Sequence, residues 1–298
     1  MGLPGELAPE LYDEIKALEI RAQRLVDEGL VGRYESAFKG RGMELLDVRP
    51  YHPGDSVRFI DWHVTARTGQ PHVQRHREER ELRVHFLVDL SGSGSFGSVE
   101  KSKREVAAEV TALLAWAATA SNDPVGLVAF TDKIEFTLPP RKGPAQVWRL
   151  IRTILALEPA GTGTDLAGAL DYLGRLARRR SVVFVVSDFL TRGYRAELSH
   201  LASRHDVTAL VIVDPHEENL PPLGLVEIED AETGERRLID SSSPALAAAA
   251  KAQAASRARH RSELFRSLGV DELILSTDRP YIETLLAFFR ARERRLRR

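Results

Sequence analysis

From Leu82 onward, short runs of β-branched residues alternate with longer segments that have the period of an amphipathic helix. This alternation predicts right-handed βαβ crossovers, which place the strands in a mostly parallel sheet with helices on both faces. We therefore predict a doubly wound α/β domain over residues 82–298. The predicted strands are 83–88, 125–130, 134–138, 181–186, 207–213 and 272–275. The predicted helices are 101–120, 145–157, 166–178, 194–203, 244–268 and a terminal helix from Pro280.

The first 81 residues have a different pattern. An amphipathic helix is predicted over 6–28, whereas residues 31–81 are interrupted by glycine and proline and predict loops and short strands. We treat 1–81 as an N-terminal segment that precedes the α/β domain. Within that domain, Thr233-Gly234 lies between two short extended runs and predicts a hairpin over about 225–239.

Composition limits the classes of function. The 298 residues include 42 Lys and Arg against 43 Asp and Glu, so no global charge steers the chain toward nucleic acid or a membrane. The chain has no cysteine, which excludes disulfides and thiolate chemistry and favours a reducing compartment. No apolar run approaches the roughly 20 residues of a membrane-spanning helix, and residues 1–10 lack the features of a signal peptide. We expect a cytoplasmic protein without a membrane span.

Oxygen-bearing side chains follow two predicted strands and lie in one glycine-rich loop. In an open α/β sheet, ligands bind outside the carboxyl ends of the strands. Two carboxylates with neutral hydroxyls form a ligand set for Mg²⁺ or Mn²⁺. Each piece alone is also an ordinary turn or helix cap, and only their conjunction at one edge indicates a metal site. The residues are Asp89, Ser91 and Ser93 after strand 83–88, Thr164 in loop 161–165, and Asp188 after strand 181–186.

This set resembles the metal-ion-dependent adhesion site of the von Willebrand factor A domain. That site uses an Asp-x-Ser-x-Ser turn, a threonine in a later loop and an aspartate after a central strand. The resemblance implies that Asp188 binds the ion directly or through water. It also favours Thr164 over Thr162, because of the spacing to Ala169-Leu170.

The region before the sheet resembles a narrower family. Tyr51-His52-Pro53-Gly54-Asp55, residues 57–62 and Thr65-Ala66-Arg67 are similar to the signature of the domain of unknown function 58 family, bacterial proteins with an A-type domain. Residues 40–44, 48–50 and 288–290 fit the same pattern, so the resemblance extends from about Gly32 to the end of the chain. It implies an adaptor that works with a MoxR-type AAA+ ATPase, or with that ATPase's client, in the assembly or maturation of other proteins.

The signature also has a physical interpretation. Asp55, Arg58 and Asp61 suggest a charge-paired network that holds the N-terminal segment against the sheet, with Trp62 as a buried anchor. A partner-binding surface is the alternative. The basic residues within 72–80 could suggest phosphate contact, but the glutamates at 78, 79 and 81 favour a solvated strand of mixed charge. His63 and His85 have no ligand-like companions at useful spacing.

Three functions can be weighed against these features. The first, which we predict, is a non-catalytic module that uses Mg²⁺ or Mn²⁺ to bind an acidic side chain of another protein. The second is a Mg²⁺-dependent hydrolase or phosphoryl-transfer enzyme. Against it, the sequence has no Walker loop and no Gly-x-Ser-x-Gly elbow, and we expect no His or Lys at the metal edge to act as general base.

The third function is nucleic-acid binding. The tail 290–298 carries six Arg and one Glu, which gives the chain one local basic segment. The near-zero net charge and the lack of a stacking pattern among the aromatic residues disfavour nucleic acid as the partner.

Overall fold

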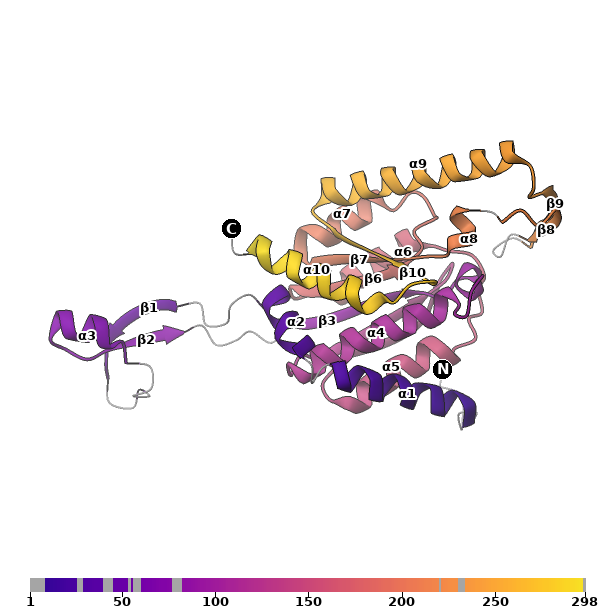
Figure 1. The fold of residues 1–298 in the computed structure, drawn as a ribbon. Helices are drawn as coiled ribbons and strands as arrows, with labels where there is room; N and C mark the ends of the chain where they lie inside the picture. Colours follow the sequence, from indigo (N-terminus) through magenta and orange to yellow (C-terminus); the bar gives the residue numbers. More distant parts are fainter. Residues whose placement is uncertain are drawn as a thin grey trace.

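The computed structural model describes residues 9–25, 29–39, 45–52, 55, 60–76, 82–219, 221–229 and 234–296. Its main body is a six-stranded sheet in the order β10-β7-β6-β3-β4-β5, with helices on both faces (Figure 1). Neighbouring strands are parallel, except that β4 and β5 are antiparallel. The doubly wound, mostly parallel α/β fold is therefore confirmed. The strands are β3 (Arg83–Asp89), β4 (Val125–Phe130), β5 (Ile134–Arg141), β6 (Ser181–Ser187), β7 (Asp206–Val213) and β10 (Asp271–Ser276).

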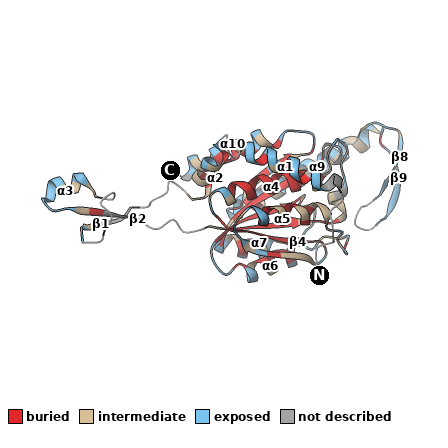
Figure 2. Cartoon of the chain, turned by 90° about the horizontal axis from the view of Figure 1, so that it is seen from below, coloured by how far each residue is buried: buried red, intermediate tan, exposed pale blue. Residues whose placement is uncertain are grey.

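The central strands are buried on both faces, which explains why the sequence shows them as continuous apolar runs. Every residue of β4 and of β6 is buried. Successive side chains point to opposite faces, so that Phe86 belongs to the core on one face and Leu87 to the core on the other. Figure 2 shows this burial running through the sheet and the inner sides of the helices.

Two hydrophobic cores, one on each face, attach the helices to the sheet. The first core contains residues of α1, α2, α4, α5 and α10, and the second contains residues of α6, α7 and α9. A capping box formed by Ser102 and Glu105 begins α4, which is buried along most of its length. The helices are α1 (Pro9–Leu25), α2 (Val31–Phe38), α4 (Lys103–Ala120), α5 (Pro144–Ala156), α6 (Leu166–Leu176), α7 (Arg195–Arg204), α9 (Pro244–Leu268) and α10 (Tyr281–Leu296).

Two short helices correct the prediction of loops and strands over residues 31–81. The first, α2, has only eight residues, and it buries Tyr34 and Ala37 in the core that it shares with the sheet. So short a helix depends on tertiary packing, which periodicity does not report. The second, α3 (Trp62–Thr68), begins at Asp61, whose side chain accepts hydrogen bonds from the N–H groups of His63 and Val64.

A small unit of β1 (Leu45–Pro50), β2 (His72–His76) and α3 lies apart from the main body (Figure 1). β1 and β2 pair antiparallel. The prediction that Trp62 is a buried anchor was wrong, because its side chain is 70% exposed. Asp55 binds Arg49 within the unit at 2.7 Å, and Asp61 caps α3. Arg58 lies outside the described residues.

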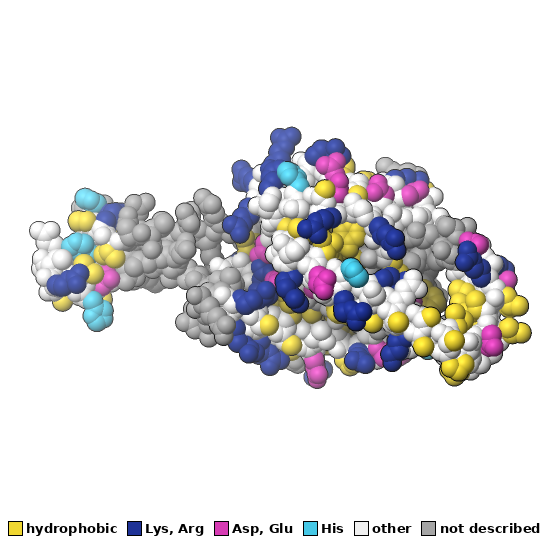
Figure 3. All heavy atoms as spheres, turned by 90° about the horizontal axis from the view of Figure 1, so that it is seen from above, with side chains coloured by type: hydrophobic (Ala, Val, Ile, Leu, Met, Phe, Trp, Pro, Cys, Tyr) yellow, Lys and Arg dark blue, Asp and Glu magenta, His cyan; other side chains and the backbone are white. Residues whose placement is uncertain are grey.

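The predicted hairpin is present between β7 and α9. β8 (Leu225–Glu229) and β9 (Arg236–Asp240) pair antiparallel after the short helix α8 (Pro215–Glu218). Leu225 and Leu238 are both exposed, and hydrophobic side chains gather at this end of the face shown in Figure 3. On the rest of that face, Lys and Arg are interspersed with Asp and Glu. Among the described helices, none combines the length and apolarity that crossing a bilayer requires.

Candidate metal centre

The Asp-x-Ser-x-Ser turn continues directly from the end of β3. The side chain of Asp89 accepts a hydrogen bond from the backbone N–H of Ser91 at 2.9 Å, and the chain then forms a short 3₁₀ helix over Gly92–Ser95. This turn brings the hydroxyl oxygens of Ser91 and Ser93 to 3.1 Å from each other. One carboxylate and two hydroxyls therefore lie together at the carboxyl end of a central strand, as the sequence predicts.

The glycine-rich loop is fastened to this turn. The N–H of Gly92 donates to the carbonyl of Thr162 at 2.9 Å, so the loop that contains Thr164 lies beside the turn. Glu135 on β5 fixes the start of the loop by accepting the N–H of Gly161 at 2.9 Å. A Cβ at Gly161 would lie 1.9 Å from a side-chain oxygen of Asp132, so a larger residue there would displace that side chain.

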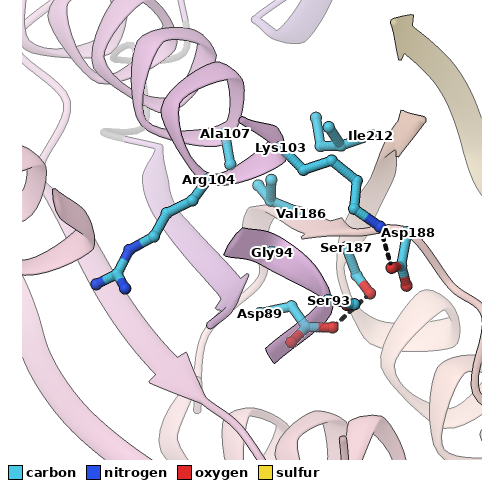
Figure 4. Close-up of a pocket in the computed structure, with 10 residues that line it drawn as sticks. All are labelled: Asp89, Ser93, Gly94, Lys103, Arg104, Ala107, Val186, Ser187, Asp188 and Ile212. Atoms are coloured by element: carbon cyan, nitrogen blue, oxygen red, sulfur yellow. Dashed lines mark hydrogen bonds and ion pairs between the residues drawn. The ribbon is translucent and has the colours of Figure 1, made fainter. Parts of the chain in front are cut away.

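Asp188 lies on the neighbouring strand end. β6 pairs in parallel with β3, and the hydroxyl of Ser187 donates to the second oxygen of Asp89 at 2.7 Å. Asp188 comes next in the chain, and its carboxylate accepts the ammonium of Lys103 at 2.8 Å (Figure 4). Its other oxygen accepts the N–H of Leu190 at 3.1 Å. Asp89 and Asp188 thus occupy one edge of the sheet in different surroundings.

The sequence predicts no His or Lys at this edge of the sheet to act as general base, and the structure does place one lysine there, Lys103. It is the first residue of α4, its side chain is 3% exposed, and its ammonium binds Glu217 as well as Asp188. Burial works to lower the pKa of Lys103, but the two carboxylates outweigh that effect and raise it. Lys103 therefore stays protonated and cannot act as a general base. His216 also follows a strand at this edge, with an exposed side chain.

Sequence reasoning could have found Lys103 from its place in the predicted helix. It lies within the first turn of a helix that follows the Asp-x-Ser-x-Ser turn, so its backbone necessarily starts at the same edge. A first-turn lysine is ordinarily a solvated side chain, and its two partners lie 85 and 114 residues away along the chain. Only the folded arrangement brings them together.

The donor set fits a small divalent cation. Burial, and then the charge of Asp188, raise the pKa of Asp89 to about 6. In the described part of the chain, Asp89 is hydrogen-bonded to an N–H and a hydroxyl and forms no ion pair with Lys or Arg. The carboxylate lines a cavity of about 20 Å³, which has room for one water molecule or one small ion and is also lined by Ser93, Asp188 and Lys103. A cation there would offset the unfavourable charge that raises this pKa.

A divalent cation at this site would need the hydroxyl oxygens as ligands as well as the carboxylates. No group of three or more His, Asp or Glu side chains placed to hold a metal occurs among the described residues. The oxygens that the structure brings together are those of Asp89, Ser91 and Ser93, with the loop that contains Thr164 beside them. Such an all-oxygen set suits Mg²⁺ or Mn²⁺ better than zinc.

The protein is therefore a doubly wound α/β protein with a candidate cation site. The turn, the loop and the acidic strand end of that site lie at the carboxyl edge of the parallel strands. The sequence profile described as "Protein of unknown function DUF58" matches residues 47–261. The chain belongs to this family. The uncharacterized proteins Rv1480 of Mycobacterium tuberculosis and Mb1516 of Mycobacterium bovis are each 34% identical to it over 292 residues, covering 96% of this chain and 91% of theirs.

Similarity to solved structures is more distant. The conserved hypothetical protein BatB from Bacteroides thetaiotaomicron has a TM-score of 0.44 and 16% identity, and the match covers 72% of this chain and 99% of BatB. The pilus adhesin SpaC from Lactobacillus rhamnosus GG has a TM-score of 0.39 and 11% identity, covering 74% of this chain and 31% of the adhesin.

Proposed function

We propose that this protein is a non-catalytic interaction module that uses Mg²⁺ or Mn²⁺ to bind a carboxylate of another protein. Asp89, Ser91, Ser93 and Thr164 would hold the ion, with Asp188 acting through water. When bound, the ion supplies a Lewis-acidic position that an Asp or Glu of the partner can occupy. The observation that carries the proposal is Asp89, a carboxylate with a raised pKa beside two hydroxyls, on a cavity of the size of one ion.

Binding is favoured over turnover by the surroundings of this carboxylate. A hydrolase needs a base of suitable pKa within reach of its nucleophile. The ammonium of Lys103 is committed to Asp188 and Glu217 and remains protonated, so it does not supply that base. The two serines hydrogen-bond to each other, and no bond from either to a histidine occurs among the described residues, in contrast to an activated nucleophile.

The partner we propose is a MoxR-type AAA+ ATPase or its client, in the cytoplasm. This choice is supported by two resemblances. Residues 51–67 resemble the signature of the domain of unknown function 58 family, and the Asp-x-Ser-x-Ser turn resembles that of the von Willebrand factor A domain.

The first test is Mn²⁺ binding by isothermal titration calorimetry. Asp89→Ala is expected to abolish binding and to keep the circular dichroism spectrum of the wild type. Asp171→Ala is the matched control, because Asp171 is an exposed carboxylate on α6 that pairs with Arg175 away from the site. Equal Mn²⁺ affinity of the wild type and Asp89→Ala would show that the site is wrongly placed.

The second test is recovery of the partner. A pull-down with purified MoxR-type ATPase is expected to need Mg²⁺ or Mn²⁺, to weaken with chelator and to be lost in Asp89→Ala. Recovery that is equal with and without chelator would contradict the role of the ion. Phosphoester hydrolysis by the wild type, absent in Asp89→Ala, would contradict the non-catalytic proposal and favour the enzyme alternative.

A further inference from the structure

The buried ammonium of Lys103 gives the two aspartates at the carboxyl edge of the sheet different surroundings, because it binds Asp188. Its Nζ lies 2.8 Å from an oxygen of Asp188 and 2.6 Å from an oxygen of Glu217. The three groups come from α4, the end of β6 and α8, so the contact exists only in the folded chain. The side chain of Asp188 is 9% exposed and that of Glu217 is 27% exposed, so solvent screens the pair with Asp188 least.

Asp188 is consequently engaged at both of its oxygens, by Lys103 on one side and by the N–H of Leu190 on the other. Asp89 differs, since its hydrogen-bond partners in the described part of the chain are neutral donors, namely the N–H of Ser91 and the hydroxyls of Ser187 and Ser91. Lys103 also lines the small cavity that Asp89 faces (Figure 4). A cation that enters the cavity would meet one available carboxylate and one that is already neutralised by a lysine.

We propose that Lys103 is a built-in counter-cation that competes with the divalent ion for Asp188 and thereby sets a weak affinity for that ion. The inference rests on the proposed metal site and names its regulator. Its positive charge repels a second cation in the same cavity, and its hydrogen bond occupies the oxygen that Asp188 would otherwise offer. Weak binding leaves the ion dependent on a carboxylate from the partner, so that ion and partner bind together.

A substitution of Glu217 is expected to change the affinity for the divalent ion in the opposite direction to a substitution of Lys103. This carboxylate shares the ammonium with Asp188. Removing its charge by Glu217→Gln leaves Lys103 to Asp188 alone, which should strengthen that pair and weaken the binding of a divalent ion further. Removing the ammonium by Lys103→Met, which keeps the length of the unbranched side chain, should have the opposite effect. Damage to folding would not change affinity in two opposite directions.

The experiment is Mn²⁺ titration calorimetry on the full chain, with thermal melting in chelator to confirm that each variant is folded. Lys103→Met is expected to bind Mn²⁺ roughly 10- to 100-fold more tightly than the wild type, the range in which changes around metal ligands alter affinity. Glu217→Gln is expected to bind more weakly than the wild type. Lys103→Arg keeps a cation at this position and is the matched control, with affinity closer to the wild type than to Lys103→Met.

A double-mutant cycle tests the competition directly. Asp188→Asn should change Mn²⁺ affinity less than about threefold in the wild type, and roughly tenfold or more in the Lys103→Met background. Unchanged or weaker Mn²⁺ binding by folded Lys103→Met would overturn the proposal.

A loss of more than about tenfold in Asp188→Asn alone would overturn it as well, and this variant keeps the proposal testable if Lys103→Met does not fold. Failure of the underlying metal site has a different signature, namely Mn²⁺ binding that is the same in the wild type and in Asp89→Ala.

Discussion

Arg292 near the end of α10 provides the sharpest test of what holds the helices to the sheet. Arg292 is only 8% exposed. Its guanidinium donates to Asp206 and Asp271, which begin β7 and β10. It also donates to the carbonyl of Ala37 at 2.7 Å and lies 4.4 Å from the centre of the Phe38 ring. One side chain therefore joins α10 and α2 to two strands of the sheet.

Replacing Arg292 by Met should remove all of these contacts and leave Asp206 without this partner. Breaking a buried ion pair by removing one member costs about 3–5 kcal/mol. Asp271 keeps Arg295 at 2.6 Å, so we expect the lower end, about 3 kcal/mol. At roughly 2–4 °C per kcal/mol for a domain of this size, the melting temperature should fall by about 6–12 °C.

The matched control is Arg295→Met on the same helix. Arg295 binds the same Asp271, but its side chain is 59% exposed, and exposed pairs contribute about 0–1 kcal/mol. Differential scanning calorimetry of both variants decides the question. Equal melting temperatures for Arg292→Met and Arg295→Met would refute the reasoning, because burial would then not distinguish the two arginines. The same contacts predict that truncation after Phe289 destabilises the fold, so that a test of the basic tail should keep Arg292.

Two further predictions concern the other residues singled out in the sequence. Trp62→Ala should leave the melting temperature within about 2 °C of the wild type, because the ring is 70% exposed; a loss of 3–5 kcal/mol, as for a buried aromatic, would contradict this placement. Burial, with smaller contributions from His205 and Arg83, lowers the pKa of His85 from 6.5 to about 4. The unfolded chain therefore binds the proton more readily, so the contribution of neutral His85 is complete above pH 6.5 and is lost as the pH falls toward 4. By urea denaturation, the wild type should lose about 2 kcal/mol more than His85→Leu between pH 7.5 and pH 5, and equal losses would show that His85 does not titrate this way.

The periodicity and apolar runs of the sequence predict most helices and strands of the α/β body. The strand predicted over 125–130 and the helix predicted over 244–268 have the bounds of β4 and α9. These elements have strong periodicity or long apolar runs, and their ends carry proline, glycine or a cap, which act within a few residues. The Asp-x-Ser-x-Ser turn was predictable for the same reason, since Asp89, Ser91 and Ser93 are placed by a strand end and the turn that follows it.

The sequence by itself therefore determined the order of the elements and the edge at which Asp89 and Asp188 would meet, because strand direction alone brings those ends together. Only the tertiary structure decided which groups surround them. Lys103 reaches Asp188 and Glu217 across three separate elements, and Trp62 is exposed because its unit stands apart from the sheet. Periodicity reports which face of an element is apolar, whereas the partner of a buried charge depends on residues that are distant in the chain and become neighbours only when the layers pack.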